Sequence, residues 1–114
     1  YHVKQIRAVA TSALRTASNG EEFLAKVSSE TGIEAEIIGG DREAALIYQG
    51  VHGAINMTEE KCLIMDIGGG SVEFIICNKE KIFWKMSYDI GVARLIEHFF
   101  NSDPISETDI KKLK

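Results

Sequence analysis

The 114-residue sequence is poor in residues that break or cross-link a chain, with one proline and two cysteines. Cys62 and Cys77 are far apart and belong to no Cys-x-x-Cys pair, and the chain has only three histidines. Neither a disulfide framework nor a zinc module is therefore indicated, and free buried thiols are expected. Long apolar runs are also missing, because the most apolar stretch, 62–70, contains Asp66. A membrane-spanning helix is therefore excluded.

The chain has no excess of positive charge. Thirteen Lys and Arg residues stand against seventeen Asp and Glu, which gives a net charge of −4 and a pI near 5.4. A protein that binds a nucleic-acid polymer through its phosphates needs a basic surface, so that function class is excluded. Small anionic ligands stay open, because backbone N–H groups bind phosphate whatever the net charge.

The length and the 45% hydrophobic content are those of one ordinary globular domain. The first residues, Y-H-V-K-Q, include no initiator Met and no charged-then-apolar signal pattern. We therefore expect a cytoplasmic protein of which this chain is an internal segment.

Hydrophobic patterns divide the chain into two parts. Strands and helices alternate in the first part, whereas three strand-like segments follow one another in the second and predict an antiparallel meander. Strands are expected over 3–10, 33–38, 62–67, 72–77 and 82–88. Helices are expected over 13–17, 21–31 and 42–55, after Gly91, and from Ser106, where a Ser-x-x-Asp cap begins. Packing between layers is expected of Phe83, Trp84, Met86, Phe99 and Phe100.

The sharpest motif is D-I-G-G-G-S-V-E at 66–73, between two apolar strands. Three glycines allow a tight turn that presents several N–H donors to a phosphate, and Ser71 adds a hydroxyl. Asp66 and Glu73 flank the loop, where carboxylates can hold Mg²⁺. A plain hairpin turn with solvated acids is the alternative, although a hairpin needs only one or two glycines. The motif is neither a dinucleotide fingerprint nor a Walker-type phosphate loop, because no helix follows directly and no Lys follows the glycines.

Two further motifs lie where a predicted strand passes into a helix. In G-G-D-R-E at 39–43, Glu43 falls in the first helical turn, beyond the carboxyl end of a strand where α/β sheets bind ligands. It is a candidate general base for water, or it only stabilises the helix dipole. In A-T-S-A-L-R at 10–15, Arg15 can clamp a phosphate or form an ordinary surface ion pair. His52 and His98 are isolated on helices and are not candidates.

Four segments together resemble one family. They are A-T-S-A-L-R (10–15), I-I-G-G-D-R-E-A-A-L-I-Y-Q-G-V (37–51), M-D-I-G-G-G-S-V-E (65–73) and I-G-V-A-R-L-I-E-H-F (90–99). Their order and spacing are similar to those of the exopolyphosphatase / guanosine pentaphosphate phosphohydrolase family of the actin-like ATPase superfamily. The resemblance implies an α/β fold of the actin-like (ribonuclease H-like) type. Residues 1–57 would then complete a first lobe and residues 58–114 would open a second.

The resemblance also implies roles for individual residues. Glu43 would be the catalytic base, and Asp66 and Glu73 would hold Mg²⁺. Phosphate contacts would come from Arg15, Gly68, Gly69 and Ser71. The substrates would be inorganic polyphosphate, which loses its terminal phosphate, or guanosine pentaphosphate, which loses its 5′ phosphate.

Other functions remain open at this stage. The same fold serves kinases, and a non-catalytic module could keep the phosphate loop without turnover. Because the family's first phosphate loop would precede Tyr1, we expect the 114-residue segment alone to be inactive or very weak. Open strand edges also predict that copies of it can form a homodimer.

Overall fold

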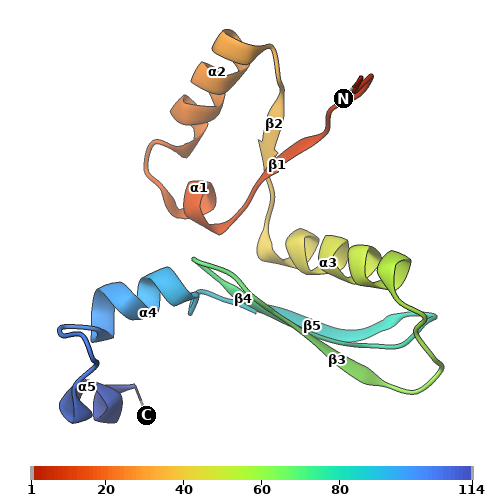
Figure 1. The fold of residues 1–114 in the computed structure, drawn as a ribbon. Coiled ribbons are helices and arrows are strands. Elements are labelled where there is room, and N and C mark those ends of the chain that lie inside the picture. The colour runs from red at the N-terminus through yellow and green to blue at the C-terminus, as the bar shows by residue number, and fades with distance from the viewer. Residues whose placement is uncertain (1, 114) are drawn as a thin grey trace.

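The computed structural model describes residues 2–113 and shows a mixed α/β fold (Figure 1). The strands are β1 (Ala8–Ala10), β2 (Ala35–Ile37), β3 (Cys62–Ile67), β4 (Val72–Cys77) and β5 (Ile82–Tyr88). The helices are α1 (Ser12–Thr16), α2 (Gly20–Thr31), α3 (Gly40–Ala54), α4 (Val92–Phe99) and α5 (Glu107–Lys112). The predicted α/β fold class is confirmed.

The strands form two separate sheets joined by α3. Strands β1 and β2 pair in parallel, with α1 and α2 in the crossover between them. Strands β3, β4 and β5 form the predicted antiparallel meander, and their bounds match the sequence prediction. Helix α3 begins directly after β2 and packs on β4 and β5, so it connects the two sheets in space as well as in sequence (Figure 1).

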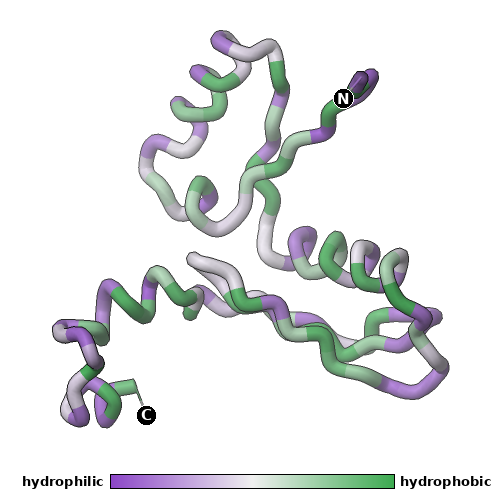
Figure 2. The backbone as a smooth tube through the Cα atoms, in the orientation of Figure 1, coloured by the Kyte–Doolittle hydropathy of each residue, from purple (hydrophilic) through white to green (hydrophobic). Residues whose placement is uncertain are grey.

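One face of the meander is covered by α3 and holds the small core. Ala44 of α3 and Ile75 and Cys77 of β4 are fully buried there. The hydroxyl of Tyr48 donates to the backbone carbonyl of Asn78 at 3.0 Å, which fixes the second half of α3 over the end of β4. Figure 2 shows hydrophobic segments along the meander and α3, and others on α2, β2 and α4.

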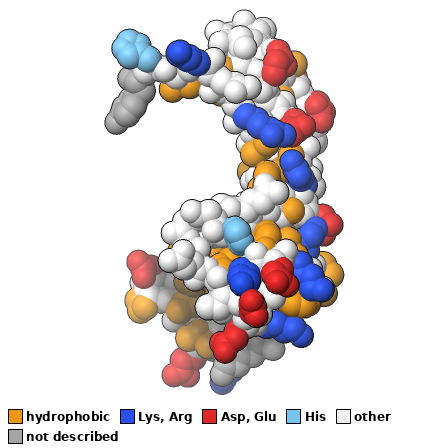
Figure 3. Space-filling view, turned by 90° about the vertical axis from the view of Figure 1, so that its right-hand side faces the viewer, with side chains coloured by type: hydrophobic (Ala, Val, Ile, Leu, Met, Phe, Trp, Pro, Cys, Tyr) orange, Lys and Arg blue, Asp and Glu red, His pale blue; other side chains and the backbone are white. Residues whose placement is uncertain are grey.

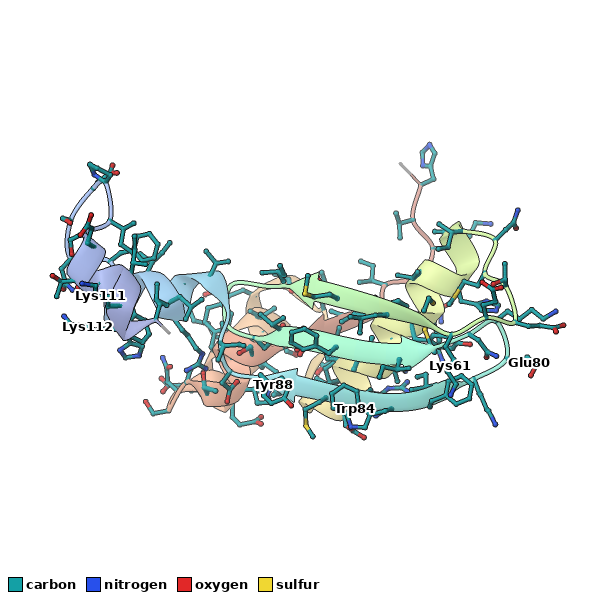
Figure 4. The ribbon with its side chains drawn as sticks, turned by 90° about the horizontal axis from the view of Figure 1, so that it is seen from below. Lys61, Glu80, Trp84, Tyr88, Lys111 and Lys112 are labelled. Atoms are coloured by element: carbon teal, nitrogen blue, oxygen red, sulfur yellow. The ribbon has the colours of Figure 1, made fainter. Side chains whose placement is uncertain are left out.

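The other face of the meander is exposed, which corrects the prediction for the aromatic residues. Trp84 and Met86, which lie opposite Ile76 and Phe74 in the ladder, are 41% and 43% exposed. Figure 4 shows Trp84 and Tyr88 on β5, with no helix of the described chain lying over them. Successive strand residues point to opposite faces, and α3 covers only one of the two. Of the other residues predicted to pack between layers, Phe83 of β5 and Phe100 after α4 are also exposed, and Phe99 of α4 is half-buried.

Several predicted elements change at their ends. The strand expected over 3–10 is limited to Ala8–Ala10, because its partner β2 offers only three residues to pair with. Helix α3 begins at Gly40, two residues earlier than predicted. The Ser106 cap is confirmed, since its Oγ accepts the N–H of Asp109 at 3.1 Å. The expectation of buried thiols is confirmed for Cys77 and wrong for Cys62, which is exposed.

The surface carries charges of both signs. Figure 3 shows Lys and Arg side chains interspersed with Asp and Glu over the face in view. Within residues 2–113, no helix combines the length and apolar character that crossing a bilayer requires.

Candidate functional site

Arg15 and Glu43, two candidates from different motifs, form an ion pair. The Arg15 Nη1 atom donates to Glu43 Oε2 at 3.0 Å and to the carbonyl oxygen of Ile38 at 2.9 Å. Their side chains are 22% and 15% exposed. Arg15 therefore links α1 to the segment in which β2 passes into α3. The ion pair with an acid, which the sequence left open for Arg15, is present. The roles of Arg15 in phosphate binding and of Glu43 in base catalysis remain predictions.

Glu73, the third candidate, is buried against β5. It is 1% exposed, and its Oε1 atom accepts a hydrogen bond from Ser87 Oγ at 2.6 Å. A buried carboxyl group needs such a partner, because burial without one is costly. Sequence reasoning missed Ser87, since its only signal is the register that places it opposite Glu73.

Gly40, the first residue of α3, brings these two pairs to one place. A Cβ on Gly40 would lie 2.5 Å from Ser87 Cβ, 2.7 Å from Ser87 Oγ and 3.8 Å from Arg15 Nη2. Only a residue without a side chain fits this approach of the helix start to β5. The Arg15–Glu43 pair and the Ser87–Glu73 pair therefore meet across Gly40.

The glycine loop joins β3 to β4 and is held by the start of α4. Within it, the N–H of Gly68 donates to the carbonyl oxygen of Ser71 at 2.9 Å. N–H groups of the first turn of α4 donate to the carbonyl oxygens of Gly68 and Gly69 at 3.0 and 2.9 Å. The Arg94 Nε atom donates to the carbonyl oxygen of Gly70 at 2.8 Å. These bonds fix the loop and occupy one of the N–H groups that was expected to face phosphate.

Sequence reasoning also missed the cation at this loop, Arg94. Its Nη2 atom donates to the hydroxyl of Thr16 at 3.2 Å, so the same side chain bridges the loop and α1. An open hollow of about 370 Å³ lies between the loop, α1 and α4. It is lined by Ala13, Thr16, Gly69, Gly70, Ala93, Arg94 and Glu97.

Ser12 is a second residue whose position the sequence did not reveal. Within the described residues, no side-chain cap is present at the start of α1. Ser12 is 4% exposed, its Oγ atom has no hydrogen-bond partner within residues 2–113, and a Cβ on Gly70 would lie 2.5 Å from that oxygen. Buried hydroxyls without a partner are uncommon. This one lies directly against the predicted phosphate loop.

The carboxylates near the loop are compatible with one common mode of Mg²⁺ binding. Asp66 lies opposite Glu73 in the β3–β4 ladder, so both carboxyl groups are on the face that α3 covers, although Asp66 is exposed. Among residues 2–113 no group of three or more His, Cys, Asp or Glu side chains is placed to enclose a metal. Mg²⁺ commonly binds through one or two carboxylates together with substrate phosphates and water. Asp66 and Glu73, beside the predicted phosphate loop, fit that mode.

Comparison with known proteins identifies the family. The model of the Ppx/GppA phosphatase family matches residues 1–114, and the chain belongs to this family. A crystal structure of an exopolyphosphatase from Cytophaga hutchinsonii is 46% identical, with a TM-score of 0.91 over 96% of this chain. The Aquifex aeolicus PPX-GPPA enzyme is 36% identical, with a TM-score of 0.74 over 97% of this chain.

One curated relative is a much longer protein than this chain. The bifunctional 3-dehydroquinate synthase/phosphatase of Fusobacterium nucleatum is 41% identical over 98 residues, which are 85% of this chain and 15% of that protein. The chain covers 35% of the Cytophaga structure and 37% of the Aquifex structure. It therefore spans about a third of the solved relatives and a smaller share of the curated one.

Proposed function

We propose that the full-length protein is a phosphohydrolase that releases terminal phosphate from inorganic polyphosphate or the 5′ phosphate from guanosine pentaphosphate. The observation that carries the proposal is the convergence of the Arg15–Glu43 and Ser87–Glu73 pairs across Gly40. The family and the names of the relatives, an exopolyphosphatase and a phosphatase, support the same reaction class.

In this proposal Glu43 positions a water molecule and takes its proton as the water attacks phosphorus in line. Arg15 orients the Glu43 carboxylate, because the same guanidinium is also fixed by the carbonyl of Ile38. Phosphoryl transfer passes through a loose transition state, so correct placement of the water and stabilisation of charge supply most of the catalysis. The fixed Arg15–Glu43 pair provides such placement.

The remaining residues hold the phosphate. Gly68, Gly69 and Ser71 form the loop that contacts it, and Asp66 and Glu73 would hold Mg²⁺. When bound, Mg²⁺ would neutralise negative charge on the phosphate oxygens. The hydrogen bond from Ser87 keeps the Glu73 carboxyl group in one orientation within the sheet.

A comparison of Glu43→Gln with Glu22→Gln tests the proposal. Glu22 is exposed on α2, away from the site, and provides a matched loss of one carboxylate. The measurement is Mg²⁺-dependent phosphate release from polyphosphate and from guanosine pentaphosphate by the full-length protein. We expect Glu43→Gln to lower turnover by about 10²–10⁴-fold, the usual contribution of a general base, while ligand binding persists. Glu22→Gln should retain activity.

Three results would contradict the proposal. Equal turnover of the two variants would remove Glu43 from the role of base. Binding without hydrolysis by the unmutated protein would indicate a non-catalytic module. Nucleotide-dependent phosphorylation of a sugar would indicate a kinase. We expect residues 1–114 alone to show little or no phosphate release.

A further inference from the structure

Cys62 and Cys77 form a facing pair at the end of the β3–β4 hairpin that is remote from the glycine loop. They lie directly opposite each other in the antiparallel ladder, and their Sγ atoms are 3.7 Å apart. Cys62 is exposed, whereas Cys77 is fully buried in the core under α3. Neither residue belongs to the candidate phosphate site.

The backbone already has the spacing that a disulfide requires. Opposite residues of an antiparallel pair have Cα atoms about 4.5–5.5 Å apart. Disulfide-bonded cysteines have Cα atoms about 4.4–6.8 Å apart. Side-chain rotation alone can therefore bring the two sulfur atoms together, without a change of strand register.

We propose that Cys62 and Cys77 are a redox-active dithiol, a modification site that low-molecular-weight disulfides such as oxidised glutathione convert to a cross-strand disulfide. This inference does not depend on the proposed phosphohydrolase activity. It rests on the register, the contact between the sulfur atoms and the opposite exposure of the two thiols.

The exposure of the two thiols sets the order of the reaction. Burial raises the pKa of Cys77 to about 11, so its thiol is protonated at neutral pH and does not react first. The exposed Cys62, as thiolate, attacks one sulfur of oxidised glutathione, forms a mixed disulfide and releases one glutathione thiolate. Cys77 then gives up its proton to solvent and attacks the Cys62 sulfur, which expels the second glutathione as a thiolate that takes a proton back from solvent. Two protein thiols are oxidised to one disulfide, and one glutathione disulfide is reduced to two thiols.

The bond would close the open end of the hairpin beneath α3. Tyr48 of α3 and Ile64 of β3 pack against the core around Cys77, so the disulfide would join an exposed strand end to the buried core. A disulfide stabilises a protein mainly by restricting its unfolded chain. We therefore expect the oxidised form to melt at a higher temperature than the reduced form.

The test is incubation of the protein with oxidised glutathione at pH 7.5, followed by intact mass and non-reducing peptide mapping. The expected product is a monomer lighter by two hydrogen atoms, with a Cys62–Cys77 peptide link that dithiothreitol reverses. Cys77→Ala should stop at the mixed disulfide, so that Cys62 keeps one glutathione. Cys62→Ser should leave Cys77 unmodified while the protein remains folded.

Three outcomes of the glutathione experiment would overturn the inference. The first is a stable mixed disulfide on Cys62 in the unmutated protein, and the second is the formation of disulfides only between copies. The third is modification of Cys77 by glutathione to the same extent in the unmutated protein and in Cys62→Ser. The reaction of the unmutated protein decides the matter even where a variant fails to fold. Phenylarsine oxide, which binds two adjacent thiols with loss of water, should protect both cysteines from alkylation. Protection of neither would also overturn the inference.

Discussion

Ser87 Oγ donates to the buried Glu73 carboxyl group across the β4–β5 ladder, at 2.6 Å. We predict that Ser87→Ala lowers the free energy of unfolding by about 1–3 kcal/mol, because it leaves a buried polar group without this partner. Urea denaturation measures the change. Ser29→Ala, which removes an exposed hydroxyl on α2, is the control and should have little effect. Equal stabilities of the two variants would show that Glu73 does not depend on Ser87.

Alanine substitutions at two of the three glycines of helix α3 should have opposite effects on stability. Gly40→Ala should destabilise the protein by about 1–3 kcal/mol, the usual effect of overpacking, because its Cβ would lie 2.5 Å from Ser87 Cβ. Gly50→Ala should stabilise it by about 0.5–1 kcal/mol, since no atom of the described residues lies within 4 Å of the new methyl group and alanine favours the helix. Thermal melting of the two variants checks both signs. Tolerance of Gly40→Ala would mean that α3 is not seated against β5 as described.

The contact between Ser12 and Gly70 links α1 to the glycine loop. Gly70→Ala should be destabilising because its Cβ would lie 2.5 Å from Ser12 Oγ, whereas Gly69→Ala should be tolerated, with only the Ala93 Cβ at 4.0 Å. Ser12→Gly should relieve the clash. A double-mutant cycle on unfolding should then give a coupling of about 0.5–3 kcal/mol between positions 12 and 70. Strict additivity would place the two residues out of contact.

Asp109 provides a test by pH. Hydrogen bonds from Ser106 lower the pKa of the Asp109 carboxyl from its ordinary value of 3.8, and those from Asn101 and Lys112 act in the same direction. A lowered pKa stabilises the fold above the ordinary value, and this contribution is lost as the pH falls through the lowered value. Ser106→Ala should therefore raise the midpoint of the Asp109 carboxyl titration followed by NMR. Ser102→Ala, whose hydroxyl instead donates to the Pro104 carbonyl, should leave it unchanged.

Local patterns were sufficient for the elements of the second half of the chain. The three meander strands match their predicted bounds, because apolar segments bounded by Gly-rich or polar turns define strand ends locally. The Ser106 cap was predictable for the same reason, since both of its partners lie within one helical turn. In the first half, the strand predicted over 3–10 was too long, because its length depends on a distant partner, β2.

Local sequence patterns are enough to show which residue types stand at the candidate site and on which kind of element each one lies. The partners of these residues depend on long-range packing, because Arg15 meets Glu43 across 28 positions and Ser87 meets Glu73 across 14. Such pairings depend on strand register and on how α3 packs against the sheet, and neither is fixed by near neighbours in sequence. The contact between Cys62 and Cys77 and the exposed outer face of the meander were decided in the same way.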